Sequence, residues 1–275
     1  VESVRIGGTF AVQPPANAGR YLQVEAAVRD GGAEFSARLL PVGGIHREQP
    51  YRRLLPLEQA AQRWLDEPVG HLEQAIPPEE KLRAALHGSA VAALFNQVQL
   101  SHTGADISCT SLGNEPAGLA ASVTMRAITA AYLFSNTLVV LEITEEILRA
   151  LLERCASYFT LENGTPRVSD AFLAPKVEHY NYDFFAGISY QFDLRQPVGR
   201  RLTRLSRLDG TPLGPGPLRL CTSNYRATGT GGYDALRTCP VLWRGSVEMP
   251  ELVAEYVRAN SPVSLPCNGR MEAIW

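Results

Sequence analysis

Lysine is almost missing from this sequence of 275 residues, and so are several patterns that mark a definite class of protein. Only Lys81 and Lys176 are lysines among the 26 basic residues, which we interpret first as a compositional bias or a stability adaptation. With a formal net charge of -2, the chain is not expected to bind nucleic acid by neutralising phosphates. It has no run of about 18 apolar residues, so we expect no membrane-spanning helix.

The sequence also lacks the motifs that are typical of metal-binding sites and of activated nucleophiles. The five cysteines form no CxxC pair, so we expect free and mostly buried thiols, with one disulfide left open for an exported protein. The five histidines show neither HxH nor HxxxH spacing, and there is no GxSxG elbow. These residues are Cys109, Cys155, Cys221, Cys239 and Cys267, and His46, His71, His87, His102 and His179. From the residues alone, the chain shows no catalytic machinery.

What is present is a mixture of helix and strand patterns. Two strands around Asp30-Gly31-Gly32 predict a hairpin over residues 21–42, and the charged block 47–68 predicts a connecting helix. We expect one helix over 76–100 and another after Thr144, which can cap it. Strands are predicted over 137–143, 184–194, 201–213 and 217–223, and a last helix over 246–259. Without a strict βαβ rhythm, this mixture favours an α+β fold with a mixed sheet.

The stretch NYRATGTGGY, residues 224–233, follows the predicted strand 217–223 and allows three interpretations. It is not a P-loop, because it lacks the GxxxxGK[ST] spacing and the lysine that contacts the phosphates. A turn that lets the chain reverse is the simplest interpretation, since glycine accepts backbone conformations that other residues avoid. The third is that Tyr225, between a strand and a glycine loop, presents a flat ring to a ligand.

Four segments, in this order, resemble the C-terminal domain of the 5′-nucleotidases. They are ADISCTS (105–111), AYLFSNTLVVLEITEEILRALLERCASYF (131–159), HYNYDFFAGISYQFDLRQP (179–197) and TSNYRATGTGGY (222–233). The resemblance covers about 68–275 and is greatest to the bacterial 2′,3′-cyclic-nucleotide 2′-phosphodiesterase/3′-nucleotidase branch. It implies an α+β fold with a 5′-nucleotidase C-terminal-domain-like mixed sheet and packed helices.

In this family the C-terminal domain holds the nucleoside and sandwiches the base between two aromatic rings. The matching rings here are Phe134 and Tyr225, and Asn136 matches a polar side chain that reaches the base edge. The resemblance implies a substrate-binding set completed by Arg226, Gly229 and Gly231. Tyr182, Asp183 and Asp193 also match family positions, and we expect structural roles for them. The resemblance favours the third interpretation of residues 224–233.

Residues 1–45 resemble the last hairpin of the family's N-terminal metallophosphatase domain, 46–67 form a linker helix, and 68–275 form the substrate-binding domain. The resemblance implies that two divalent metal ions lie in that N-terminal domain of a longer parent, since its DxH, GDxxD, GNHE and GHxH motifs do not occur here. We expect no cofactor and no catalytic residue in this chain, which is either a fragment or a naturally shortened protein. Alone it is expected to hydrolyse nothing.

Nucleosides or nucleotides and the N-terminal metallophosphatase domain are the partners that the resemblance implies. Rotation of the domain is a family property, and the helix near Leu55–Trp64 is the candidate hinge. The family is extracellular, periplasmic or cell-wall-associated, although the start VESVRIGGTF shows no signal-peptide pattern.

Two positions depart from the pattern of 5′-nucleotidases proper. Gly231 stands where an aspartate contacts the nucleoside, and Glu115 lies near the place of an arginine that helps to hold the phosphate. Both departures fit the cyclic-phosphodiesterase/3′-nucleotidase branch. They also keep open an alternative, a non-catalytic surface or interaction module that kept the fold.

Overall fold

The computed structural model describes residues 3–44, 48–265 and 267–275, and the chain divides into two compact units, 1–59 and 60–275. The border falls inside helix α1 (Glu48–Leu65), the helix predicted as a connection. His46 lies outside the described residues. No helix in the described ranges is long and apolar enough to cross a membrane.

The first unit contains two antiparallel β-ladders. Strands β1 (Ser3–Ile6) and β2 (Thr9–Val12) form one, and β3 (Arg20–Arg29) and β4 (Gly32–Pro41) form the other. The turn of the second hairpin lies at Asp30-Gly31, as the sequence predicted, and Gly31 has a φ of 104° that favours glycine. The rings of Phe10 and Phe35 stack with centroids 6.0 Å apart.

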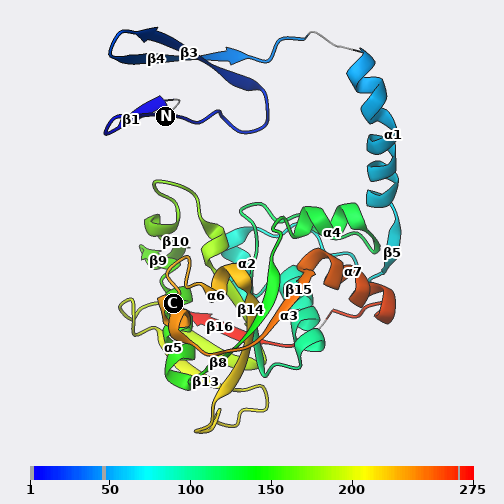
Figure 1. Cartoon of the computed structure of the whole chain (residues 1–275). Helices are drawn as coiled ribbons and strands as arrows, with labels where there is room; N and C mark the ends of the chain where they lie inside the picture. Colours follow the sequence, from blue (N-terminus) through cyan, green and yellow to red (C-terminus); the bar gives the residue numbers. More distant parts are fainter. Residues whose placement is uncertain (1–2, 45–47, 266) are drawn as a thin grey trace. The chain divides into compact units, whose positions relative to one another are not determined.

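The second unit is built on a five-stranded mixed sheet of order β11-β6-β14-β8-β15 (Figure 1). Its strands are β11 (Asp183–Ala186), β6 (Ile107–Ser111), β14 (Leu218–Ser223), β8 (Thr137–Ile143) and β15 (Val241–Glu248). Only β14 and β6 pair in parallel, while the other three ladders are antiparallel. This confirms the predicted α+β class with a mixed sheet.

Strand β8 is buried because its two faces enter two different cores. Val139 and Leu141 pack into a core with α5 (Glu145–Ala156), whereas Leu138 and Val140 pack into a second core. The second core also receives the apolar faces of α3 (Ala90–Thr103), α4 (Met125–Ala131) and α7 (Met249–Asn260). A continuous apolar run is what a strand with two covered faces requires.

Thr144 caps α5 as predicted, because its side chain accepts a hydrogen bond from the Ile147 amide. The single helix predicted over 76–100 is wrong: the structure has α2 (Lys81–His87) and α3, separated at Gly88. Gly88 has a φ of 91°, outside the helical region, and Ser89 starts the next helix by accepting from the Ala92 amide. The predicted helix over 246–259 starts at Met249, since 246–248 belong to β15.

The single strand predicted over 184–194 is also wrong, because Gly187 divides it between two sheets. With a φ of 87°, Gly187 separates β11 from β12 (Ile188–Asp193), and an added Cβ would lie 2.2 Å from the Asp106 carbonyl oxygen. Strand β12 then joins a three-stranded sheet with β13 (Leu202–Arg207) and β16 (Arg270–Ile274). Smaller pairs are β5 (Pro68–His71) with β7 (Ser122–Thr124), and β9 (Phe159–Glu162) with β10 (Thr165–Val168).

Candidate functional site

Phe134 and Tyr225 border one pocket of about 270 Å³ in the second unit. The two rings stay 37% and 42% exposed. Among the described residues, the rings of Phe134 and Tyr225 do not stack on each other, so the space between them is not closed by a ring–ring contact. The other lining residues are Ser111, Asn136, Lys176 and Tyr180.

Phe134 is held from one side by buried aromatic packing. Helix α4 ends at Ala131, and the ring of Tyr132 turns into the core, edge-on to Phe95 with centroids 5.2 Å apart. Phe134 then packs edge-on against both Tyr132 and Tyr180, each at 6.4 Å. These two near-perpendicular contacts hold the Phe134 ring, which stays partly exposed.

Asn136 contributes the amide of the pocket. Its Nδ2 donates to the Tyr132 hydroxyl at 3.4 Å, and its backbone carbonyl accepts from the Met249 amide at 2.9 Å. Burial raises the pKa of Tyr132 to about 12, so this hydroxyl stays neutral. Asn136 is therefore oriented by its neighbours and offers an amide that can both donate and accept.

Tyr225 lies on the short helix α6 (Asn224–Ala227), which follows β14 directly. Ser223 caps this helix by accepting from the Arg226 amide at 3.1 Å. Asn224 Oδ1 accepts from the amides of both Tyr225 and Thr137, at 3.0 and 3.2 Å. Because Thr137 directly follows Asn136, one side chain ties together the two segments that bring Phe134 and Tyr225 to the pocket.

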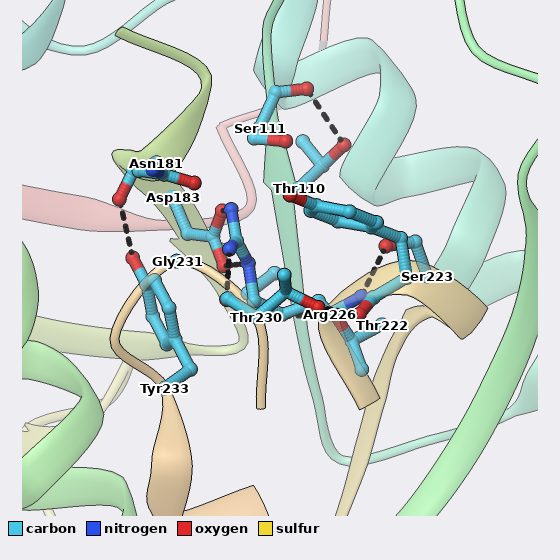
Figure 2. A network of polar contacts seen from close by, with 12 residues as sticks. Thr110, Ser111, Asn181, Asp183, Thr222, Ser223, Arg226, Thr230, Gly231 and Tyr233 are labelled. Carbon is cyan, nitrogen blue, oxygen red and sulfur yellow. Dashed lines mark hydrogen bonds and ion pairs between the residues drawn. The ribbon is translucent and has the colours of Figure 1, made fainter. Parts of the chain in front are cut away.

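Arg226 lies behind the pocket, not in its lining. Its guanidinium donates from Nε and Nη2 to the two carboxylate oxygens of Asp183, each at 2.9 Å, and both side chains are almost fully buried. Nη1 donates to the Thr230 carbonyl at 2.6 Å (Figure 2). Nη2 also donates to the Tyr180 carbonyl at 2.8 Å. Burial is the largest single effect on Arg226 and opposes its charge, but the charge and hydrogen bonds of Asp183, together with Tyr233 and Cys109, hold its pKa above the ordinary value.

The glycine-rich loop closes around this guanidinium. Gly229 and Gly231 have φ values of 82° and 77°, and the Gly231 carbonyl accepts from Arg154 Nε at 2.8 Å. The hydroxyls of Thr228 and Thr230 donate to the Tyr225 carbonyl at 2.7 and 2.9 Å. These hydrogen bonds stabilise the turn of the loop that follows α6. The positive φ values of this turn explain why the loop contains glycines, and no phosphate-binding role is needed to explain them.

Of the six residues predicted to bind substrate, the structure places Phe134, Asn136 and Tyr225 at one pocket. Arg226, Gly229 and Gly231 stand behind it, where they shape the loop. Sequence reasoning did not identify Ser111, Lys176 and Tyr180 as lining residues. Ser111 and Tyr180 lie within two of the recognised segments, and Lys176 is one of only two lysines, which are the signals that could have drawn attention to them.

Among the described residues, no group of three or more histidine, cysteine, aspartate or glutamate side chains could hold a metal ion. All five cysteines fall within the described ranges and are free, and four of them are buried, as the sequence predicted. The residues that line the pocket offer a ligand aromatic rings, one amide, hydroxyl groups and one ammonium group.

The mixed sheet carries an open pocket that is bordered by two exposed aromatic rings. A family model described as "5'-nucleotidase, C-terminal domain" matches residues 68–238. The chain therefore belongs to this family, which confirms the resemblance seen in the sequence.

Two curated proteins are similar to this chain. The Trifunctional nucleotide phosphoesterase protein YfkN of Bacillus subtilis (strain 168) is 27% identical over 139 residues, 46% of this chain and 9% of that protein. The 2',3'-cyclic-nucleotide 2'-phosphodiesterase/3'-nucleotidase of Haemophilus influenzae is 23% identical over 258 residues, 81% of this chain and 38% of that protein. The chain thus spans well under half the length of either relative.

Solved structures show the same fold. A Staphylococcus aureus structure, assigned by its name to the 5'-nucleotidases and determined with alpha-ketoglutarate, superposes with a TM-score of 0.82 and 27% identity. The match covers 98% of this chain and 54% of that one. A 5'-nucleotidase precursor from Thermus thermophilus has a TM-score of 0.63 at 19% identity, over 99% of this chain and 54% of that one.

Proposed function

We propose that this chain is the nucleoside-binding part of a metal-dependent nucleotide phosphoesterase, a nucleotidase or 2′,3′-cyclic phosphodiesterase. One observation carries the proposal: Phe134 and Tyr225 border a single pocket, with the amide of Asn136 beside them. Every nucleobase has a π-face, and stacking one base on an aromatic side chain contributes about 1–3 kcal/mol. The amide can pair with donors and acceptors on the base edge.

In this proposal the chain contributes binding energy and orientation. The phosphoester would be hydrolysed at two divalent metal ions in an N-terminal metallophosphatase domain outside this sequence. Holding a substrate in the correct geometry can by itself remove a large part of a reaction barrier, because the entropy of alignment is lost on binding and not in the reaction. The names of the two curated relatives support this class of substrate, and their greater length is compatible with a longer parent.

The predicted three-part division, with 1–45 as a metallophosphatase remnant, 46–67 as a linker and 68–275 as the binding domain, is part of the proposal. So are the hinge at Leu55–Trp64, within α1, and an extracellular, periplasmic or cell-wall location of the parent. The competing interpretation is a non-catalytic interaction module, which a pocket filled by side chains would have favoured. The open pocket of about 270 Å³ favours a ligand.

Calorimetric titration of this chain with adenosine tests the proposal. Tyr225→Ala should weaken binding by about tenfold or more, the effect of losing one stacked ring, whereas Tyr225→Phe should retain most of the affinity. If the unmutated chain shows no heat of binding while its thermal unfolding is intact, the interaction module becomes the better interpretation.

A further inference from the structure

Lys176 places an ammonium group at the rim of the pocket between Phe134 and Tyr225. It is exposed and lines the pocket together with Tyr180. Its Nζ donates to the Tyr180 hydroxyl at 3.1 Å and lies 5.3 Å from the centroid of that ring. The Tyr180 ring in turn lies edge-on to Phe134, with centroids 6.4 Å apart. The cation is therefore held beside the rings by an aromatic neighbour.

The carboxylates near Lys176 have other partners. Glu178 accepts from the Tyr180 hydroxyl through Oε1 at 3.1 Å and from Asn181 Nδ2 through Oε2 at 2.9 Å. Asp183 is buried in its pair with Arg226. Among the described residues, no carboxylate lies within ion-pair distance of Lys176, so its hydrogen bond to a neutral hydroxyl leaves donors free.

Among the lining residues only Lys176 carries a charge, although the nearby Glu178 carboxylate, which forms no ion pair with it, also acts on its ammonium. Arg226 and Asp183 neutralise each other beneath the surface, and the remaining lining groups, from Ser111, Phe134, Asn136, Tyr180 and Tyr225, are neutral side chains. The hydrogen bond from Lys176 to Tyr180 raises the pKa of the ammonium, so it stays protonated at neutral pH. A single unpaired cation beside a ring pocket is suited to a flat ligand that carries an anionic group.

We propose that Lys176 is a specificity-determining residue that binds the phosphate of a nucleotide whose base lies at Phe134 and Tyr225. The inference rests on the proposed function, because it needs a base in the pocket. It goes beyond it by explaining how the binding domain itself would prefer nucleotides to nucleosides. Tyr180 is the positioning residue, since its hydroxyl and ring hold the ammonium at the rim.

The test is calorimetry of the whole 275-residue chain with adenosine and with 2′-, 3′- and 5′-AMP, at low and high salt. The unmutated chain should bind at least one of the monophosphates about fivefold or more tightly than adenosine, with a preference that salt reduces. Lys176→Met should abolish that preference, measured as the ratio of monophosphate to adenosine affinity within the variant, together with its salt dependence, while Lys176→Arg should restore part of it. Arg200→Met, which removes an exposed cation outside the pocket, is the control for net charge.

The outcomes separate the two proposals. If adenosine binds but no monophosphate binds more tightly, or if Lys176→Met keeps the preference, the role of Lys176 is wrong and the nucleoside site stands. If Lys176→Met and Arg200→Met reduce the preference equally, the effect is one of overall charge and the specific role is also wrong. If neither adenosine nor any monophosphate binds, the proposed function fails and this inference fails with it.

Discussion

Arg226 and Asp183 form a buried two-point ion pair, with both nitrogen–oxygen distances at 2.9 Å. Asp183 begins β11, and Arg226 lies on α6 beside Tyr225. The same guanidinium holds the carbonyls of Tyr180 and Thr230. The pair therefore joins the segment that carries Tyr180 to the one that carries Tyr225, both of which line the pocket.

Asp183→Asn is expected to destabilise the second unit strongly. Removing one partner leaves the buried guanidinium without its counter-charge, which typically costs about 3–5 kcal/mol. Asp66→Asn is the matched control, because it breaks the exposed pair with Arg126 and should have only a minor effect on stability. Urea unfolding of the two variants measures both losses, and equal losses would contradict a special role for the buried pair.

Gly231→Ala should cost more stability than Gly164→Ala, although both glycines have a φ of 77°. A Cβ on Gly231 would lie 2.2 Å from Asn181 Oδ1 and 2.5 Å from Arg226 Nη1, whereas Gly164 has open space around it. The shared positive φ contributes about 1–2 kcal/mol to each variant. Crowding against the pinned arginine should add about 1–3 kcal/mol at Gly231 only, and urea unfolding would show this difference.

Phe134→Ala should weaken adenosine binding by about tenfold, comparable to Tyr225→Ala, because each variant removes one stacking face. Its neighbour Leu133 is 62% exposed and does not line the pocket, so Leu133→Ala should leave the affinity within about twofold. Calorimetry gives both affinities. An equal loss in the two variants would indicate a disturbed loop in place of a lost ring.

Lys81 should make stability rise with pH above neutrality. Burial lowers the pKa of its ammonium from 10.5 to about 8 in the folded chain, although the charge of Glu79 opposes the shift. Unfolding therefore takes up a proton between these two pKa values, and the free energy of unfolding increases with pH in that window. Allowing for solvent screening, the wild type should gain about 1 kcal/mol over Lys81→Met between about pH 7 and 9.5. Urea unfolding at both pH values measures it, and a pH-independent difference would contradict it.

The isolated chain should not hydrolyse 2′,3′-cyclic AMP or 3′-AMP, with or without added divalent metal. The reason is that the proposal places the metal centre in another domain. Chromatography for AMP formed from the cyclic substrate, and phosphate release from 3′-AMP, check this against a Tyr225→Ala preparation as a control for contaminating enzymes. Turnover that disappears in the variant would assign catalysis to this chain and overturn the proposal.

The sequence predicted correctly those helices and turns that depend on interactions between residues close together in the chain. Thr144 caps α5, and a threonine before two glutamates favours a helix start through local interactions. The breaks at Gly88 and Gly187 were missed, since a glycine inside a periodic pattern is compatible with continuation, and only the positive φ in the fold decides. The family resemblance singled out Phe134 and Tyr225. It could not indicate Lys176, whose place at the pocket depends on how residues 173–181 pack against Tyr225 and Phe134.

Arg226 does not line the pocket, yet its mutation is expected to weaken ligand binding. A mutational scan that scored only ligand affinity would group Arg226 and Asp183 with Phe134 and Tyr225, because loss of the ion pair would displace the rings. Only a parallel scan of abundance or folding would distinguish the two sets. In this domain a residue that lines the pocket and a residue that holds it in place are neighbours in the chain, since Tyr225 and Arg226 are adjacent on one short helix.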